Sequence, residues 1–253
     1  WEEYTPSPGM AQNDWNNFVT FVTSNNMTIP ANWTYVDTTF NWKSLVDYIV
    51  LNSYVVTSDW LNWNTAWWRG LDTGAAEKWR YALWDNDATF GHYINYTNVP
   101  STGPTADPCN PEGLGNTGGQ GHIPVLNKLI TNPLFQQYYI SRFIDLNNTF
   151  FDCANLIAIL DSMALNIQPE MAAHCAKWGG SVGQWQGNVT AMKTWISQRC
   201  AAIDQGLIDC YTLTGPYALI VDVMPAGAGK VKVNSITPST FAYTGSYFGG
   251  IDI

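Results

Sequence analysis

Charged residues are scarce in this chain of 253 residues. They make up 12% of the sequence, with 11 Lys and Arg against 20 Asp and Glu, and the net charge is −9. A basic face that could bind nucleic acid or an anionic membrane is therefore not expected, because both partners need clustered positive charge. Binding of a nucleotide stays open, because a bound metal ion can invert the local field.

Long apolar runs are also missing. No segment approaches the length needed to span a membrane, and neither a starting Met nor a signal peptide is present. We therefore expect no membrane insertion. The chain begins with WEEY and ends with FGGIDI, within a stretch that resembles a strand. We interpret it as a piece of a longer polypeptide.

Cysteine is present, but in no metal-binding pattern. The five cysteines include no CxxC pair, which excludes the usual structural zinc sites. In an oxidising compartment we expect up to two disulfides with one cysteine left over. The local pairs Cys153–Cys175 and Cys200–Cys210 are the predicted bridges, although five cysteines allow many other pairings.

Several features favour a secreted protein, either extracellular or on the cell surface. Charge is low, Asn is abundant, and the chain contains 13 Trp and 13 Tyr. Five N-x-S/T sequons would allow a glycoprotein, but the Asn content alone gives nearly as many by chance. The sequons begin at Asn26, Asn32, Asn95, Asn147 and Asn188.

Hydrophobic residues amount to 46% of the chain, enough for the core of one large domain or somewhat more. Helical spacing of apolar residues predicts helices over 10–26 and 41–56, and helical patterns dominate from Ile123 to about Leu207. The pattern changes to alternation after Tyr211. There we predict one strand with Leu219, Val221 and Val223, and another with Val231 and Val233. The predicted fold class is α+β, with a soft boundary near Thr212 between domains 1–211 and 212–253.

The segment 98–121 is rich in Pro, Gly and Thr and is predicted to be a loop. It contains Gly113-x-Gly115-x-x-Gly118, which formally matches the dinucleotide-binding fingerprint. We reject this match, because no predicted strand precedes it and no βαβ unit surrounds it.

The most informative stretch runs from Asp59 to Gly91. Aromatic-rich segments from Asn64 to Arg69 and from Lys78 to Trp84 are predicted strands, with Asp72-Thr73-Gly74 as the turn between them. We therefore predict a central β-hairpin that returns the chain to its starting point.

Such a hairpin would bring Asp59 and Asn64, at its entrance, close to Asp85 and Asp87, at its exit. Three carboxylates and an amide are costly to bury without a partner, so a cluster of this kind usually holds a cation or lines an open cleft. The alternative is a pair of turns that Asx side chains stabilise, without chemistry.

The spacing of these residues matches a phosphoryl-transfer site. Asp59-x-x-x-x-Asn64 has the D-x-x-x-x-N spacing of the protein-kinase catalytic loop, where the Asp orients the substrate hydroxyl and the Asn binds magnesium. Asp85-x-Asp87, followed by Phe90-Gly91, stands where kinases place a metal-binding Asp after the next hairpin. Hard oxygen ligands suit magnesium or manganese.

At this point the sequence resembles the CotH kinase-like family, atypical protein kinases named after spore coat protein H, in its secreted bacterial type. The resemblance covers roughly residues 1–223. One departure is Thr57, where the family pattern leads us to expect Asn. The residues that carry the resemblance are Asp47-Tyr48, Asn52, Asp59-Trp60, Asn64, Trp68-Arg69-Gly70, Lys78-Trp79-Arg80, Trp84 to Gly91, and the segments that begin at His122 and Gln168.

The resemblance implies the larger, mostly helical lobe of an atypical kinase, with the central hairpin and a short C-terminal β appendage. It implies Asp59 as the catalytic residue, Asn64, Asp85 and Asp87 as metal ligands, and Asp85 and Asp87 as nucleotide-binding residues. His92 is an accessory candidate, and the cofactors are Mg²⁺ or Mn²⁺ with ATP. The small lobe with its Lys–Glu pair is expected upstream, so this part alone is expected to be inactive.

Two other function classes stay open. One is a catalytically inactive scaffold or surface-assembly module on the same fold, and the other is an adhesion or carbohydrate-binding module that Ca²⁺ stabilises. The expected partners are a protein substrate or a neighbouring surface protein, within a larger extracellular structure, and neither nucleic acid nor a membrane.

Overall fold

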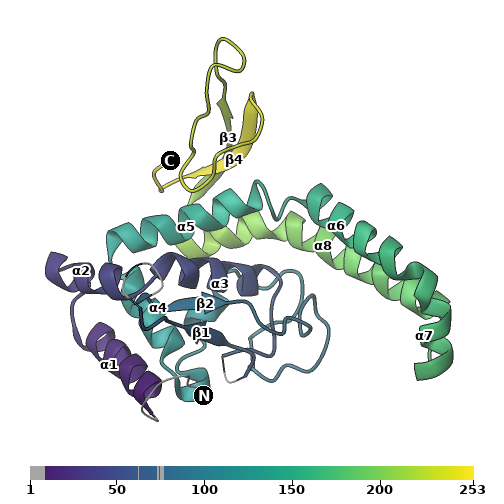
Figure 1. The fold of residues 1–253 in the computed structure, drawn as a ribbon. Coiled ribbons are helices and arrows are strands. Elements are labelled where there is room, and N and C mark those ends of the chain that lie inside the picture. The colour runs from purple at the N-terminus through teal and green to yellow at the C-terminus, as the bar shows by residue number, and fades with distance from the viewer. Residues whose placement is uncertain (1–8, 62, 73, 75–76) are drawn as a thin grey trace. The chain divides into compact units, whose positions relative to one another are not determined.

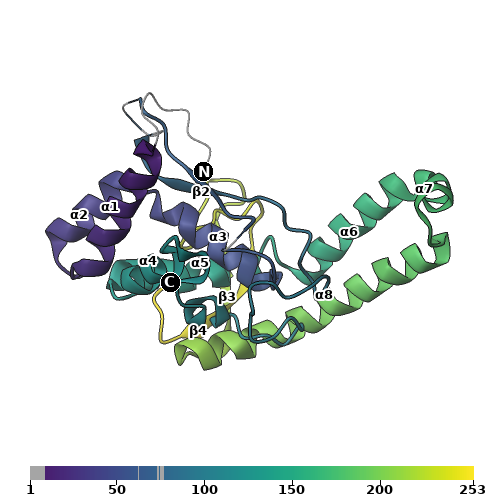
Figure 2. The same cartoon turned by 90° about the horizontal axis from the view of Figure 1, so that it is seen from below.

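A computed structural model describes residues 9–61, 63–72, 74 and 77–253 of the chain. About 52% of the structure is helical, and two small antiparallel sheets complete it, which confirms the predicted α+β class (Figures 1 and 2). The chain divides into two compact units. The first unit comprises 1–89, 93–100 and 109–140, and the second unit comprises 90–92, 101–108 and 141–253.

The first unit is built from helices around one short hairpin. The predicted helices at 10–26 and 41–56 are both present, and a further helix lies between them. The elements are α1 (Met10–Ser24), α2 (Pro30–Thr39), α3 (Trp42–Tyr54), β1 (Ala66–Trp68), β2 (Arg80–Ala82), the 3₁₀ helices η2 (Asn110–Gly113) and η3 (Thr117–Gly119), α4 (His122–Ile130) and the first half of α5 (Pro133–Asn147).

Aromatic side chains form the centre of the first unit. Trp15 of α1 is fully buried, and its ring lies 5.3 Å from that of Trp79 and 5.7 Å from that of Trp67. His122, at the first position of α4, packs edge-on against Trp67 with ring centroids 4.5 Å apart. Large rings bury much apolar area each, so this cluster holds the helices and the hairpin together.

The predicted hairpin is present, with shorter strands than expected. β1 and β2 are antiparallel, with Trp67 opposite Tyr81 and Trp68 opposite Arg80. Because side chains alternate along a strand, Trp67 and Tyr81 face the aromatic core, while Arg80 lies over the exposed Trp68 ring at 4.8 Å. Thr73, in the predicted turn, lies outside the described residues.

Long helices dominate the second unit. After the end of α5 it contains α6 (Cys153–Ile167), the 3₁₀ helix η4 (Gln168–Glu170), α7 (Met171–Trp178) and α8 (Val182–Tyr211). α6 and α8 run side by side in both views (Figures 1 and 2). In α6 and α7, which the structure describes completely, no residue is buried, and Met163 of α6 is 63% exposed.

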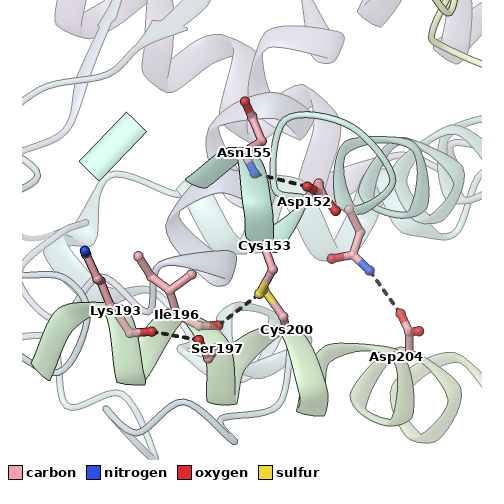
Figure 3. The surroundings of a disulfide bond; sticks show 9 residues. Asp152, Cys153, Asn155, Lys193, Ile196, Ser197, Cys200 and Asp204 are labelled. Carbon is pink, nitrogen blue, oxygen red and sulfur yellow. Dashed lines mark hydrogen bonds between the residues drawn. A yellow bond between two sulfur atoms is a disulfide. The ribbon is translucent and has the colours of Figure 1, made fainter. Parts of the chain in front are cut away.

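A disulfide between Cys153 and Cys200 joins the start of α6 to the middle of α8 (Figure 3). Cys109 and Cys210 are also disulfide-bonded, and Cys175 is free. Two disulfides with one cysteine left over are thus confirmed, while the predicted pairs Cys153–Cys175 and Cys200–Cys210 are wrong. The α6–α8 hairpin aligns residues 47 positions apart, which is why nearness in sequence misled the prediction. Disulfides of this kind fit an extracellular protein.

The C-terminal sheet pairs β3 (Thr214–Val221) with β4 (Tyr243–Gly249). The predicted strand with Val231 and Val233 is therefore wrong, since Val233 makes only an isolated bridge to Ile236. β3 pairs with β4 and not with the segment around Val231, because β4 contributes two buried aromatic side chains, Tyr247 and Phe248. The boundary near Thr212 stays a prediction.

Buried polar side chains fasten the irregular parts of the second unit to its helices. Asp145 of α5 is fully buried and accepts hydrogen bonds from the backbone N–H of Ser235 at 2.8 Å and from the Tyr247 hydroxyl at 3.1 Å. Arg199 of α8 donates to the carbonyl oxygens of Pro104, at 3.2 Å, and Ala106.

Membrane-spanning helices, which need both length and an apolar sequence, do not occur in the described part of the chain.

Candidate active site

The loop after α3 carries the first two predicted site residues. Val56 adopts a left-handed backbone with φ of 52°, which ends the helix and turns the chain. Asp59 follows, and the Asn64 side-chain nitrogen donates to the Asp59 carboxylate at 3.1 Å and to its backbone carbonyl at 3.2 Å. This double contact folds the loop back on itself and leaves Asn64 Oδ1 as the atom able to ligate a cation.

Thr65 fixes this loop to the buried helix α3. Its hydroxyl oxygen accepts from the backbone N–H of Leu61 at 2.9 Å and from the Tyr48 hydroxyl at 3.1 Å. Burial raises the pKa of Tyr48 to about 12, so the Tyr48 side chain stays a neutral donor. The position of the Asp59 loop therefore depends on a side chain in the core.

The other acidic segment lies beside the Asp59 loop. Ser58 donates its backbone N–H to the carbonyl of Ala88 at 2.9 Å, which links the residue before Asp59 to the residue after Asp87. Thr97 donates its own N–H to the Ser58 carbonyl at 2.9 Å, so three segments are joined at this point. The entrance and the exit of the hairpin thus meet.

The carboxylates of the two segments influence each other. Burial raises the pKa of Asp59 above its usual range, the negative charges of Asp87 and Asp85 raise it further, and the hydrogen bond from Asn64 opposes them. The Oδ1 atom of Asp59 is buried and has no hydrogen-bond partner among the residues that the structure describes. Asp85 and Asp87 are exposed, and Asp85 has a left-handed backbone with φ of 46°. The fold thus brings the four predicted residues into one unit and the three carboxylates within electrostatic reach of each other.

The donor set suits a cation that a nucleotide helps to hold. Within the described residues, no group of three or more His, Cys, Asp or Glu side chains is placed so that it could hold a metal ion. Mg²⁺ does not require such a group, since it is usually bound by one or two carboxylates together with phosphates and waters. The exposed Asp85 and Asp87 carboxylates fit such a partial site.

His92 is exposed and belongs to the second unit, so its accessory role stays a prediction. Sequence reasoning assigned no role to Asn52, Ser58 or Thr97, although all three organise the site. Asn52 carried a signal, because it is a polar residue among the apolar positions of α3. Thr57, where the family pattern predicts Asn, is buried, and its hydroxyl has no hydrogen-bond partner in the part of the chain that the structure describes.

Comparison with known proteins identifies the family. The family model described as CotH kinase protein matches residues 4–203. No curated protein and no solved structure matches the chain. The matched region contains the complete hairpin with Asp59, Asn64, Asp85 and Asp87, and it confirms the resemblance expected from the sequence. The chain belongs to the CotH kinase family, which indicates a kinase-like fold.

Proposed function

We propose that this protein transfers the γ-phosphoryl group of ATP to Ser or Thr residues of a protein substrate, with Mg²⁺ or Mn²⁺ as cofactor. The observation that carries the proposal is the arrangement of Asp59. Its carboxylate accepts a hydrogen bond from Asn64, keeps one buried oxygen without a partner among the described residues, and lies within electrostatic reach of Asp85 and Asp87. A kinase needs this combination of a hydroxyl-orienting carboxylate with nearby metal ligands.

The residues have separate roles in this proposal. The Asp59 carboxylate would accept a hydrogen bond from the substrate hydroxyl and orient it towards the phosphorus atom. Asn64, Asp85 and Asp87 would hold the metal ion, and Asp85 and Asp87 would thereby also position the nucleotide. The bound cation would neutralise charge on the phosphates, and placement of the reactants would supply the rest of the rate.

We further propose that the protein acts outside the cell or at its surface. Two disulfides and a low content of charged residues support secretion or display at the cell surface. The partner would be a protein that carries the acceptor hydroxyl, either a free substrate or a neighbouring subunit of an extracellular assembly.

The test is phosphate transfer from labelled ATP by the full-length protein with Mg²⁺ or Mn²⁺. We expect Asp59→Asn to lower the rate by about 10²- to 10⁴-fold, the usual contribution of a proton-accepting residue. Asp85→Asn should abolish transfer, because a metal ligand is lost. Asp72→Asn is the matched control, since Asp72 is an exposed carboxylate at the far end of the same hairpin. No transfer by the wild type, with no nucleotide-induced rise in melting temperature, would refute the proposal.

A second candidate function is an inactive surface-assembly or adhesion module. It is favoured by exposed aromatic side chains beside the acidic residues, since Trp63 is 70% and Trp84 is 63% exposed. Metal preference separates the two functions. Ca²⁺ binding without nucleotide would support adhesion, whereas Mg²⁺ or Mn²⁺ binding that requires ATP supports the kinase.

A further inference from the structure

A buried amide on α3 contacts the acidic loop directly. Asn52 is 1% exposed, and its Nδ2 donates to the Tyr48 carbonyl of the same helix at 2.8 Å. This bond fixes the plane of the amide and aims its Oδ1 away from the Tyr48 carbonyl. Oδ1 accepts a hydrogen bond from Asn86 Nδ2 at 3.2 Å.

Asn86 stands between the two proposed metal ligands in sequence. The Asn86 side chain is half-buried, whereas Asp85 and Asp87 on either side of it are exposed. The hydrogen bond to Asn52 holds the Asn86 side chain on the α3 side of the loop, while the carboxylates on either side of it stay exposed to solvent.

The backbone of this loop needs such support. Asp85 has a left-handed φ of 46°, a conformation that persists only where the surroundings impose it. Further along, Thr89 donates its hydroxyl to the Asn86 carbonyl at 3.0 Å, and Ser58 donates its N–H to the Ala88 carbonyl at 2.9 Å. The Asn52–Asn86 bond differs from these two contacts, because it holds a side chain of the Asp85–Asp87 segment itself.

We propose that Asn52 is a positioning residue, which sets the orientation of Asp85 and Asp87 for metal binding through its hydrogen bond to Asn86. The inference rests on the proposed metal-binding role of these two carboxylates. Mutation of a residue that orients a metal ligand through a hydrogen bond typically lowers metal affinity by 10- to 100-fold. Since Asn52 acts on a loop residue and not on a ligand, we expect an effect near the lower limit.

The experiment measures Mn²⁺ binding to the full-length protein by calorimetry, in the presence of a non-hydrolysable ATP analogue. Asn52→Ala and Asn86→Ala should each weaken binding by about 10-fold. The double variant should be no weaker than either single variant, because both substitutions remove the same contact. Asn86 is only half-buried, so its variant provides the test if Asn52→Ala does not fold.

Asn132→Ala is the control for a purely structural effect. Asn132 is also buried, donates to the Met27 carbonyl at 2.7 Å and accepts from the Leu134 N–H at 2.8 Å. Its loss should lower the melting temperature without changing Mn²⁺ affinity. Wild-type affinity in Asn52→Ala, additive effects in the double variant, or equal weakening in Asn132→Ala would overturn the inference.

Hydrogen exchange separates failure of this inference from failure of the proposed function. If the wild type binds no Mn²⁺ with nucleotide, the proposed function fails. The positioning inference then still predicts faster exchange of the Thr89 N–H, which is bonded to the Asp87 carbonyl, in Asn52→Ala than in the wild type. Unchanged exchange there would refute the inference by itself.

Discussion

The two units of this protein are stabilised in different ways. In the first unit, Trp15, Trp79 and other aromatic side chains are fully buried around a hairpin whose strands have three residues each. In the second unit, α6 and α7 bury no residue, although the structure describes them completely, and a disulfide joins α6 to α8. The first unit is therefore centred on packed aromatic side chains, whereas in the second unit a disulfide joins α6, which buries no residue, to α8, which buries Trp195, Ile196 and Leu207 among others.

This difference bears on function, because the candidate site lies wholly in the packed unit. Asp59 and Asp87 occupy loops, yet those loops are fixed by Tyr48, Ser58 and Thr97, which are all buried. Precise placement of reacting groups requires such rigid support. All four candidate site residues lie in the first unit.

The largest expected effect comes from removing the covalent bond. Replacing Cys153 and Cys200 by Ala should destabilise the second unit by about 4 kcal/mol, the loop-closure value for a bridge that spans 47 residues. Hydrogen exchange followed by mass spectrometry should show faster exchange in α6 and α8 and unchanged exchange in α3. Cys175→Ala is the control, because this cysteine is free. Equal loss of protection in both units would contradict the comparison.

A second prediction concerns the first unit, whose free energy of unfolding should decrease as the pH is lowered. Burial lowers the pKa of His122 to about 3, well below its usual value of 6.5. The unfolded chain therefore binds a proton between these two pH values, while the folded chain does not. This group's contribution to stability is fully present above pH 6.5 and is lost as the pH falls towards 3.

The expected slope is roughly 1 kcal/mol of unfolding free energy per pH unit. Denaturant titrations at pH 6.5, 5.5 and 4.5 would measure it. In His122→Gln the free energy of unfolding should depend less steeply on pH. The substitution also disturbs the 2.6 Å contact with the Tyr81 hydroxyl, but this contact affects the stability and not the slope. His174→Gln, at an exposed position of α7, should retain the wild-type slope. The same slope in all three proteins would show that His122 does not titrate in this way.

The sequence predicted best those elements that form between residues close together in the chain. The hairpin was predictable because two aromatic-rich segments, which contain Trp67 and Tyr81, lie on either side of a turn sequence, and closure of the hairpin places Asp59 near Asp87 without further information. The helices at 10–26 and 41–56 followed from the spacing of apolar residues such as Trp15 and Leu45, which the fold does bury.

Choices between distant partners could not be predicted. Cys153 has four candidate partners in sequence, and only the alignment of α6 with α8 selects Cys200. Likewise, β3 pairs with Tyr243–Gly249 and not with Val231 and Val233, because burial of Tyr247 and Phe248 favours the more distant strand. The role of Asn52 was hidden for the same reason, since Asn86 lies 34 positions away.

The most direct test of the central claim is the titration of Asp59, followed by carbon-13 NMR of its carboxyl group. We expect a pKa above the usual 3.8, which falls in Asp87→Asn but stays raised, because burial is the larger cause. Asp72→Asn should leave the Asp59 pKa unchanged. A wild-type pKa at or below 3.8, or one that does not respond to Asp87→Asn, would show that these carboxylates do not form one site.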